Sequence, residues 1–176
     1  IDREFKTGVA KEHSYRPALK KLFESISTSK PITAINEPQR GTFGAPDFMI
    51  KSGDAVIGFA EAKDIGVNRL DNLFDREIEQ KERYLGGLPN LIYTDYLEFR
   101  FYREGNETAR VRIADFDGKI ITPLPDKFQT LVDLIKDFYT VKTATIKSPL
   151  KLAELMAGKA RLIADVIKGA LAEQSE

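Results

Sequence analysis

The stretch that decides the fold runs from Gly44 to Gly66 and reads GAPDFMIKSGDAVIGFAEAKDIG. Two runs of strand-forming residues, 47–52 and 55–63, lie on either side of a Ser-Gly-Asp turn. A short turn of this composition between apolar strands is typical of a β-hairpin. We therefore predict that the chain folds back on itself about Gly53.

Folding the hairpin brings charged residues together. Asp47 would lie across from residue 60 or 61, so that its carboxylate can approach that of Glu61. Glu61 and Lys63 are two residues apart and would point to the same face. Two neighbouring carboxylates repel each other unless a cation lies between them, and a hard divalent ion with oxygen ligands fits that place. The main-chain carbonyl of Ala62 would be a third ligand, and Lys63 could orient a water or offset charge on a phosphate.

The same residues have a simpler interpretation. An aspartate followed at some distance by an acidic-x-Lys pattern arises by chance about once in a chain of this size. Glu61 and Lys63 would then form a solvent-exposed ion pair at a strand end, which contributes little to stability. Pro46 before the aspartate, the hairpin spacing and the apolar strand that leads to Glu61 favour the metal site.

The composition narrows the chemistry. The 176 residues include no cysteine and one histidine, His13, which excludes disulfides, thiolate metal sites and multi-histidine sites. Any metal must then be held by oxygen, which favours magnesium, manganese or calcium. The net charge is zero, from 27 basic and 27 acidic residues, so a protein whose main task is to coat nucleic acid is not expected. We expect no membrane span, since no run of about 18 apolar residues occurs, and a cytoplasmic location, since cysteines are absent.

The rest of the chain alternates helical and strand patterns. Apolar residues at helical spacing predict three helices, over 11–27, 69–87 and 126–139. Strand-forming runs predict four further strands, over 31–38, 88–95, 97–104 and 109–116, and a glycine-rich loop is predicted over 39–46. This order of elements predicts an α/β or α+β domain with a mixed central sheet.

We divide the chain into a domain over 1–141 and a helical connector over 142–176, whose helix would begin at Ser148-Pro149. The sequence starts with Ile1 rather than methionine, so we expect it to be part of a longer polypeptide. The connector would lead toward a following domain.

A second candidate feature lies in the predicted helix 69–87. Gln80 and Tyr84 are four residues apart and share one helix face. An amide and a phenol at this place could both contact a phosphate or a nucleophilic water. The alternative is an exposed glutamine beside a half-buried tyrosine.

These residues match a known family. Pro46-Asp47 followed by Glu61-Ala62-Lys63 resembles the PD-(D/E)xK nuclease superfamily, and QKERY at 80–84 resembles the Q-x-x-x-Y element of its RecB-like and Mrr-like branches. Longer segments, among them EHSYRPALKKLFES, EAKDIG and EQKERYLGGLPNLIYTDYLEFRFYREG, resemble the amino-terminal nuclease domain of single-chain restriction–modification enzymes of types IIG and ISP. In those enzymes an adenine methyltransferase follows on the same polypeptide.

The resemblance implies a restriction-endonuclease-like core and a set of site residues. The metal ligands would be Asp47, Glu61, the Ala62 carbonyl and a glutamate of the first helix, for which Glu12 is the candidate. The catalytic residues would be Asp47, Glu61 and Lys63, with Gln80 and Tyr84 as accessory site residues. The implied cofactor is Mg²⁺, for which Mn²⁺ would substitute.

The implied activity is that of a DNA endonuclease of a prokaryotic restriction–modification enzyme, which leaves 5′-phosphate and 3′-hydroxyl ends. Its partners would be double-stranded DNA and the methyltransferase and target-recognition domains of the same polypeptide, and dimerisation would allow both strands to be cut. A non-catalytic DNA or protein docking module and a stand-alone repair nuclease or junction resolvase remain alternatives. Four other charged residues, which we interpret as structural or solvated rather than as site residues, are His13, Arg16, Arg40 and Lys51.

Overall fold

The computed structural model describes residues 1–6, 8, 12–26, 30–38, 44–140 and 156–157. The chain divides into two units, Ile1–Val141 and Lys142–Glu176. Nearly all of the predicted connector helix therefore lies outside the described residues, as does most of the predicted loop 39–46. The account that follows concerns the first unit.

A mixed six-stranded sheet forms the centre of this unit, in the spatial order β1-β2-β3-β4-β5-β6. All neighbouring strands are antiparallel except β3 and β4, which are parallel. The strands are β1 Ile32–Asn36, β2 Phe48–Ser52, β3 Ala55–Ala62, β4 Asn90–Thr94, β5 Glu98–Arg103 and β6 Asn106–Arg112.

The predicted hairpin is confirmed in β2 and β3. Gly53 occupies the turn with a φ of 57°, a left-handed conformation that glycine adopts without steric cost. Phe48 pairs with Ala60, so Asp47, the residue before β2, comes opposite Glu61. The turn sets the pairing of Ser52 with Ala55, and an irregularity between Ile50 and Lys51 then shifts the register by one residue. This shift brings Asp47 opposite Glu61 rather than Ala60, so that the two acidic residues share one face.

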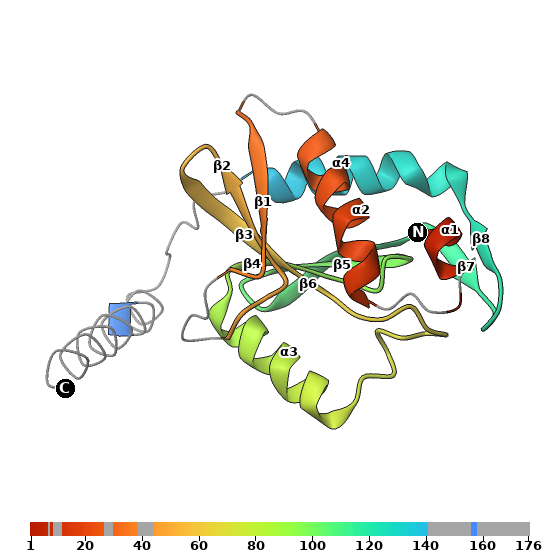
Figure 1. Ribbon diagram of the computed structural model, residues 1–176. Coiled ribbons are helices and arrows are strands. Elements are labelled where there is room, and N and C mark those ends of the chain that lie inside the picture. Colours follow the sequence, from red (N-terminus) through yellow and green to blue (C-terminus); the bar gives the residue numbers. More distant parts are fainter. Residues whose placement is uncertain (7, 9–11, 27–29, 39–43, 141–155, 158–176) are drawn as a thin grey trace, which may run out of the picture. The chain divides into compact units, whose positions relative to one another are not determined.

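Helices cover both faces of the sheet (Figure 1). Helices α2 (Glu12–Ser25) and α4 (Phe128–Tyr139) lie on one face, and α3 (Asp75–Gly87) lies on the other. The larger core lies under α2 and α4 and includes Phe23, Ile50 and Ile135, all fully buried. A smaller core under α3 contains Tyr84, Leu91 and Tyr93 among others.

Gly58 on β3 permits a close approach of α4. A Cβ at this position would lie 2.4 Å from Cζ of Phe138, which is closer than side-chain atoms pack. Phe138 can therefore seat directly on the strand, and the Asn90 side chain donates to the carbonyls of Ile57 and Phe138 to tie the same region together.

Helix α3 begins later than predicted. The pattern predicted a helix from residue 69, but the segment before Asp75 forms turns instead. Leu70 is buried in the α3-side core, and Asp71 pairs with Arg100 of the sheet, so both are held in a non-helical segment. The helix starts where the Glu77 side chain accepts a hydrogen bond from the Phe74 N–H at 2.8 Å. Phe74 and Ile78, two of the apolar residues whose spacing predicted this helix, are exposed.

The segment 109–116 is not one strand, as predicted, but two. Its first part belongs to β6 and its last part forms β7 (Ala114–Phe116), which pairs with β8 (Ile121–Pro123) in a separate two-stranded sheet. Short helices α1 (Asp2–Phe5) and η1 (Pro125–Lys127) complete the unit. Neither these two helices nor β8 was predicted from the sequence.

The predicted fold class is confirmed. The described chain is an α/β unit whose mixed central sheet is flanked by helices, in agreement with a restriction-endonuclease-like core. Within the described ranges, no helix has the length and apolar character needed to cross a membrane.

Candidate functional site

Asp47 and Glu61 meet at the open end of the hairpin. The Asp47 N–H donates to Glu61 Oε2 at 3.2 Å, and the Ala62 N–H donates to Asp47 Oδ2 at 2.8 Å. Both carboxylates are buried. The pairing of the two strands therefore holds two acidic side chains in one small volume, as the sequence predicted.

Lys63 follows the last residue of β3 and reaches the same place. Its N–H donates to the carbonyl of Thr94 on β4 at 2.8 Å, which fixes the backbone. Its Nζ donates to Glu61 Oε1 and to Gln80 Oε1, at 2.7 Å in each case. The Lys63 side chain is 7% exposed and that of Glu61 is 5% exposed. The alternative of a solvent-exposed ion pair is therefore wrong.

Gln80 and Tyr84 join the site from α3. The Gln80 Nε2 donates to the Tyr84 hydroxyl at 3.2 Å, so one run of hydrogen bonds links Tyr84 through Gln80 and Lys63 to Glu61. Tyr84 is 1% exposed, so it is more deeply buried than the simpler interpretation assumed. Gly44 packs against its ring, where a Cβ would lie 3.2 Å from the Tyr84 ring carbon Cε1. We call Asp47, Glu61, Lys63, Gln80 and Tyr84 the candidate site.

Burial raises the pKa of both carboxyl groups. For Glu61, burial and the neighbouring Asp47 charge raise the pKa to about 7, although Lys63 opposes the shift. For Asp47, burial also raises the pKa, against the Ala62 N–H and Arg16. Burial and the Glu61 charge raise the pKa of Tyr84 to about 12. The site thus holds more negative charge than its surroundings stabilise, which is typical of functional positions.

The two other predicted metal ligands are Ala62 and Glu12, and three charged residues, His13, Lys51 and Arg40, were not predicted to belong to the site. Ala62 contacts Asp47 through its N–H, and the role predicted for its carbonyl stays a prediction. Glu12 is the first residue of α2, but its side chain lies outside the described residues. His13 is exposed. Lys51 is partly exposed near the turn end of β2, four residues beyond Asp47, and Arg40 lies outside the described residues.

Arg16 was not predicted as a site residue, yet it contacts the site directly. Its Nη2 forms an ion pair with Asp47 Oδ1, and its Nη1 donates to Glu37 Oε1 at 2.8 Å. Arg16 is 8% exposed and is therefore not a solvated charge. The signal was present in the sequence, because Arg16 lies beside the apolar stripe of its helix, between Tyr15 and Leu19.

Tyr93 is a second residue that the sequence reasoning missed. It pairs with Glu61 across the parallel strands and is fully buried. Lys63 Nζ and Lys81 Nζ each lie 5.6 Å from the centre of its ring. Within the described part of the chain, the Tyr93 hydroxyl is buried without a hydrogen-bond partner. Such an unsatisfied group beside a charged site is uncommon in a structural position.

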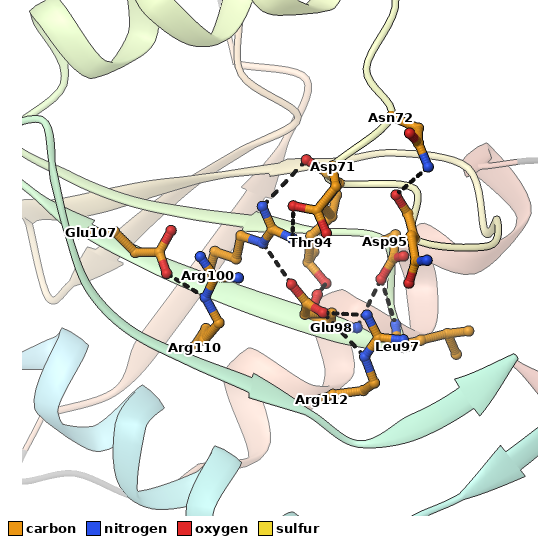
Figure 2. A network of polar contacts seen from close by, with 12 residues as sticks. Asp71, Asn72, Thr94, Asp95, Leu97, Glu98, Arg100, Glu107, Arg110 and Arg112 are labelled. Carbon is orange, nitrogen blue, oxygen red and sulfur yellow. Dashed lines mark hydrogen bonds and ion pairs between the residues drawn. The ribbon is translucent and has the colours of Figure 1, made fainter.

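A second charged cluster occupies the same face of the sheet (Figure 2). Glu98 Oε1 accepts from Arg100 Nε at 2.6 Å, and Glu98 Oε2 accepts from Arg112 Nη2 at 2.7 Å. Arg100 also donates to Asp71 Oδ1 at 2.7 Å and to the Leu70 carbonyl at 3.3 Å. Asp71, Glu98, Arg100 and Arg112, which we call the Glu98 cluster, therefore tie the segment before α3 to the sheet.

The turn between β4 and β5 connects these two regions. Asp95 Oδ1 accepts from the N–H groups of Leu97 and Glu98, at 3.1 and 2.7 Å (Figure 2). Thr94 Oγ1 donates to the Glu98 carbonyl at 2.7 Å, while the Thr94 carbonyl accepts from Lys63. One turn therefore positions both Lys63 and Glu98.

The donor set of the candidate site fits a hard divalent cation. Asp47 and Glu61 offer carboxylate oxygens a short distance apart, and a carboxylate oxygen that accepts one hydrogen bond keeps a lone pair for a metal. Magnesium commonly uses one or two carboxylates and retains several waters. No group of three or more His, Cys, Asp or Glu side chains in the described ranges could hold a metal. Among the described side chains, these two carboxylates are available to a cation, together with main-chain oxygen and water.

A comparison with solved structures agrees with the fold, whereas the sequence matches no family model and no curated protein. Among solved structures, a chain of the cryo-EM structure of the DrdV–DNA complex matches with a TM-score of 0.53 and 23% sequence identity. The match covers 76% of this chain but 12% of that chain, so this chain corresponds to a small part of the other protein. A likeness at this level shows a shared fold.

Proposed function

We propose that this chain is a metal-dependent DNA nuclease domain that hydrolyses phosphodiester bonds. The observation that carries the proposal is the convergence of Asp47, Glu61 and Lys63 on one buried point, through hydrogen bonds of 2.7 to 3.2 Å. DNA as the substrate is supported by the fold shared with a chain that is bound to DNA in the DrdV complex.

Asp47 and Glu61, with the Ala62 carbonyl, would hold the cation, and Mg²⁺ is the ion we propose. When bound, such an ion neutralises phosphate charge and makes water more acidic. The raised pKa of Glu61, about 7, supports a positive ion at this position, because a cation would favour the charged carboxylate.

Lys63 would stabilise the phosphate as charge builds on its oxygens. Two of its three ammonium protons are directed to Glu61 and Gln80, which fixes the position of Nζ. We assign the third to a non-bridging phosphate oxygen. A donor fixed before the reaction stabilises developing charge without reorganisation.

Gln80 and Tyr84 would keep Lys63 in place. The Gln80 oxygen accepts from Lys63, and its amide nitrogen donates to the Tyr84 hydroxyl. In the reaction, a water oxygen bonds to phosphorus while the bond from phosphorus to the 3′ oxygen breaks. The water loses a proton to solvent and the 3′ oxygen gains one, so the products carry a 5′-phosphate and a 3′-hydroxyl.

The parent protein that we propose is a restriction–modification enzyme of type IIG or ISP, in which methyltransferase and target-recognition domains accompany the nuclease. This rests on the sequence resemblance described above, and on the small share of the DrdV chain that the match covers. Contacts to phosphates carry no base information, so sequence recognition would come from those other domains.

The test is cleavage of supercoiled plasmid with Mg²⁺ or Mn²⁺ by the wild type and by Asp47→Asn, with binding of Mn²⁺ measured in parallel by titration calorimetry. We expect nicking and Mn²⁺ binding by the wild type and the loss of both in the variant. Arg103→Met is the control, because Arg103 pairs with Asp137 on α4 and contacts none of the candidate site. Cleavage by Asp47→Asn at the wild-type rate would refute the proposal, and metal binding without any DNA cleavage would favour a docking module.

A further inference from the structure

We propose that Arg16 competes with the divalent cation for Asp47: its guanidinium neutralises this carboxylate in the metal-free protein and lowers the affinity of the site for metal. The inference rests on the proposed function and adds a regulatory residue to it. Arg16 is a positioning residue in this account, because it acts through Asp47.

The contacts of Arg16 place it between two carboxylates of different exposure. One side of the guanidinium is paired with Asp47, whose side chain is 11% exposed. The other side donates to Glu37, whose side chain is 66% exposed. Arg16 therefore already contacts a second acceptor, which can keep its charge paired when the Asp47 oxygen is released.

Asp47 does not depend on Arg16 for its orientation. Its second oxygen, Oδ2, accepts the Ala62 N–H at 2.8 Å, from a backbone group within the paired hairpin. Removal of Arg16 would leave that bond in place. The effect of Arg16 on a cation at Asp47 is therefore mainly the repulsion between two positive charges, which disfavours binding.

The surroundings give Arg16 room to move. A groove of about 270 Å³ lies beside it, and Arg16, Glu37, His13 and Lys20 contribute to its lining. Glu37 is at this groove, so the guanidinium can shift toward Glu37 without entering the packed core.

The charges of the metal-free site explain why Arg16, rather than Lys63, is the basic group that would move away when a cation binds. Asp47 is paired with Arg16, and Glu61 is paired with Lys63. A divalent cation brings two further positive charges, and the site then holds an excess. Lys63 is enclosed by Glu61 and Gln80, whereas Arg16 has an exposed partner outside the site.

The experiment measures Mn²⁺ affinity by titration calorimetry at pH 8 for the wild type, Arg16→Met and Arg16→Lys. We expect Arg16→Met to bind Mn²⁺ about tenfold more tightly than the wild type, which follows from the loss of one neighbouring charge. Arg16→Lys, which keeps the charge, should stay close to the wild-type affinity. Arg103→Met is the control, because Arg103 also pairs with a carboxylate, but its partner is Asp137 of α4, outside the candidate site. Its Mn²⁺ affinity should be unchanged.

A second variant covers the case in which Arg16→Met does not fold. Glu37→Gln changes an exposed side chain and removes the charge of one of the two carboxylates that Arg16 contacts. Asp47 is the other, so Arg16 should pair with it more strongly, and the affinity for Mn²⁺ should fall. The inference would be overturned if folded Arg16→Met bound Mn²⁺ no more tightly than the wild type, or if Glu37→Gln left the Mn²⁺ affinity unchanged. In either case, binding of Mn²⁺ by the wild type would still support the proposed metal site. Failure of both the wild type and Arg16→Met to bind Mn²⁺ would overturn the inference and the proposed metal site together.

Discussion

The molecule contains two charged clusters, the candidate site together with Arg16 and the Glu98 cluster. Each combines two carboxylates with two basic side chains. In the candidate site, the carboxylates are neighbours, since Glu61 accepts a hydrogen bond from the N–H of Asp47. In the Glu98 cluster, Arg100 lies between the two acidic residues and donates to both Glu98 and Asp71 (Figure 2). The same kinds of residue are thus arranged in two different orders.

The arrangement of the charges decides whether the pKa of a buried carboxyl group is raised or lowered. Burial and the Asp47 charge raise the pKa of Glu61 to about 7. Burial also acts on Glu98, but the hydrogen bonds from Arg100 and Arg112 outweigh it and lower the pKa of Glu98. A cluster that alternates in charge stabilises its ionised form, whereas two adjacent buried carboxylates disfavour each other's ionised form. From this difference we propose a functional role for the first cluster and a structural role for the second.

The largest expected effect is on catalysis. We predict that Lys63→Met lowers the rate of DNA cleavage by a factor on the order of 10³, because it removes the donor assigned to the phosphate. Plasmid nicking under single-turnover conditions measures this loss. Arg110→Met is the control, since Arg110 is an exposed residue paired with Glu107, and it should cleave at the wild-type rate. Wild-type cleavage by Lys63→Met would remove the functional distinction between the clusters.

The next effect is on stability. Arg100→Met should lower the free energy of unfolding by about 3 kcal/mol, because it leaves the buried Glu98 charge with one partner and releases the Leu70 carbonyl. Urea unfolding followed by circular dichroism measures the change. A loss below about 0.5 kcal/mol, the size usual for an exposed pair, would show that the cluster is not structural.

Neutralising one carboxylate in each cluster should change stability in opposite directions. At pH 7 in the absence of metal, Glu98→Gln should destabilise the protein. Glu61→Gln should stabilise it by about 1 kcal/mol, because burial and then the Asp47 charge disfavour ionised Glu61 by more than its pairing with Lys63 favours it. The Glu98 contribution is present above the ordinary pKa of glutamate and is lost as the pH falls through its lowered folded-state pKa. Thermal unfolding between about pH 3 and about pH 8 measures both changes in stability. Changes of the same sign would contradict the comparison.

The smallest effect is expected at Tyr93, which separates the clusters. It pairs with Glu61 on one side and with Arg100 on the other. Tyr93→Phe removes a buried hydroxyl that has no hydrogen-bond partner in the described part of the chain, so stability should rise by about 1 kcal/mol. Unfolding in urea measures the gain. Tyr102→Phe is the control, because its hydroxyl donates to Glu107 at 3.2 Å and no gain is expected there.

The candidate site was predictable to the extent that it is local in sequence. Asp47, Glu61 and Lys63 belong to one predictable hairpin, but the one-residue register shift between Ile50 and Lys51, which places Asp47 opposite Glu61 rather than Ala60, was left open by the sequence. Gln80 and Tyr84 were predictable as a pair, because residues four apart share a helix face. That Gln80 contacts Lys63 depends on how α3 docks on the sheet, which periodicity does not reveal.

Two predictions from sequence that were wrong, the start of α3 and the solvation of Arg16, have a common origin. Residues 69–74 carry a helical pattern, but Arg100 holds Asp71 from 29 residues away and the helix starts only at Asp75. Arg16 resembled a solvated charge until the fold placed Asp47 beside it, across 31 residues of chain. In both cases a distant partner outweighed the local preference, as tertiary contacts generally do for propensities.

By itself, the sequence determined the hairpin and the face that Glu61 and Lys63 share, because turn chemistry and strand alternation act over a few residues. The register shift between Ile50 and Lys51, seen in the structure, placed Asp47 on that face as well. The tertiary structure alone decided which charges surround them: Arg16 beside Asp47, Tyr93 beside Glu61, and Arg100 between Glu98 and Asp71. The physical reason is that the cost of a buried charge depends on its nearest partners, and those partners come from segments that only the folded chain brings together.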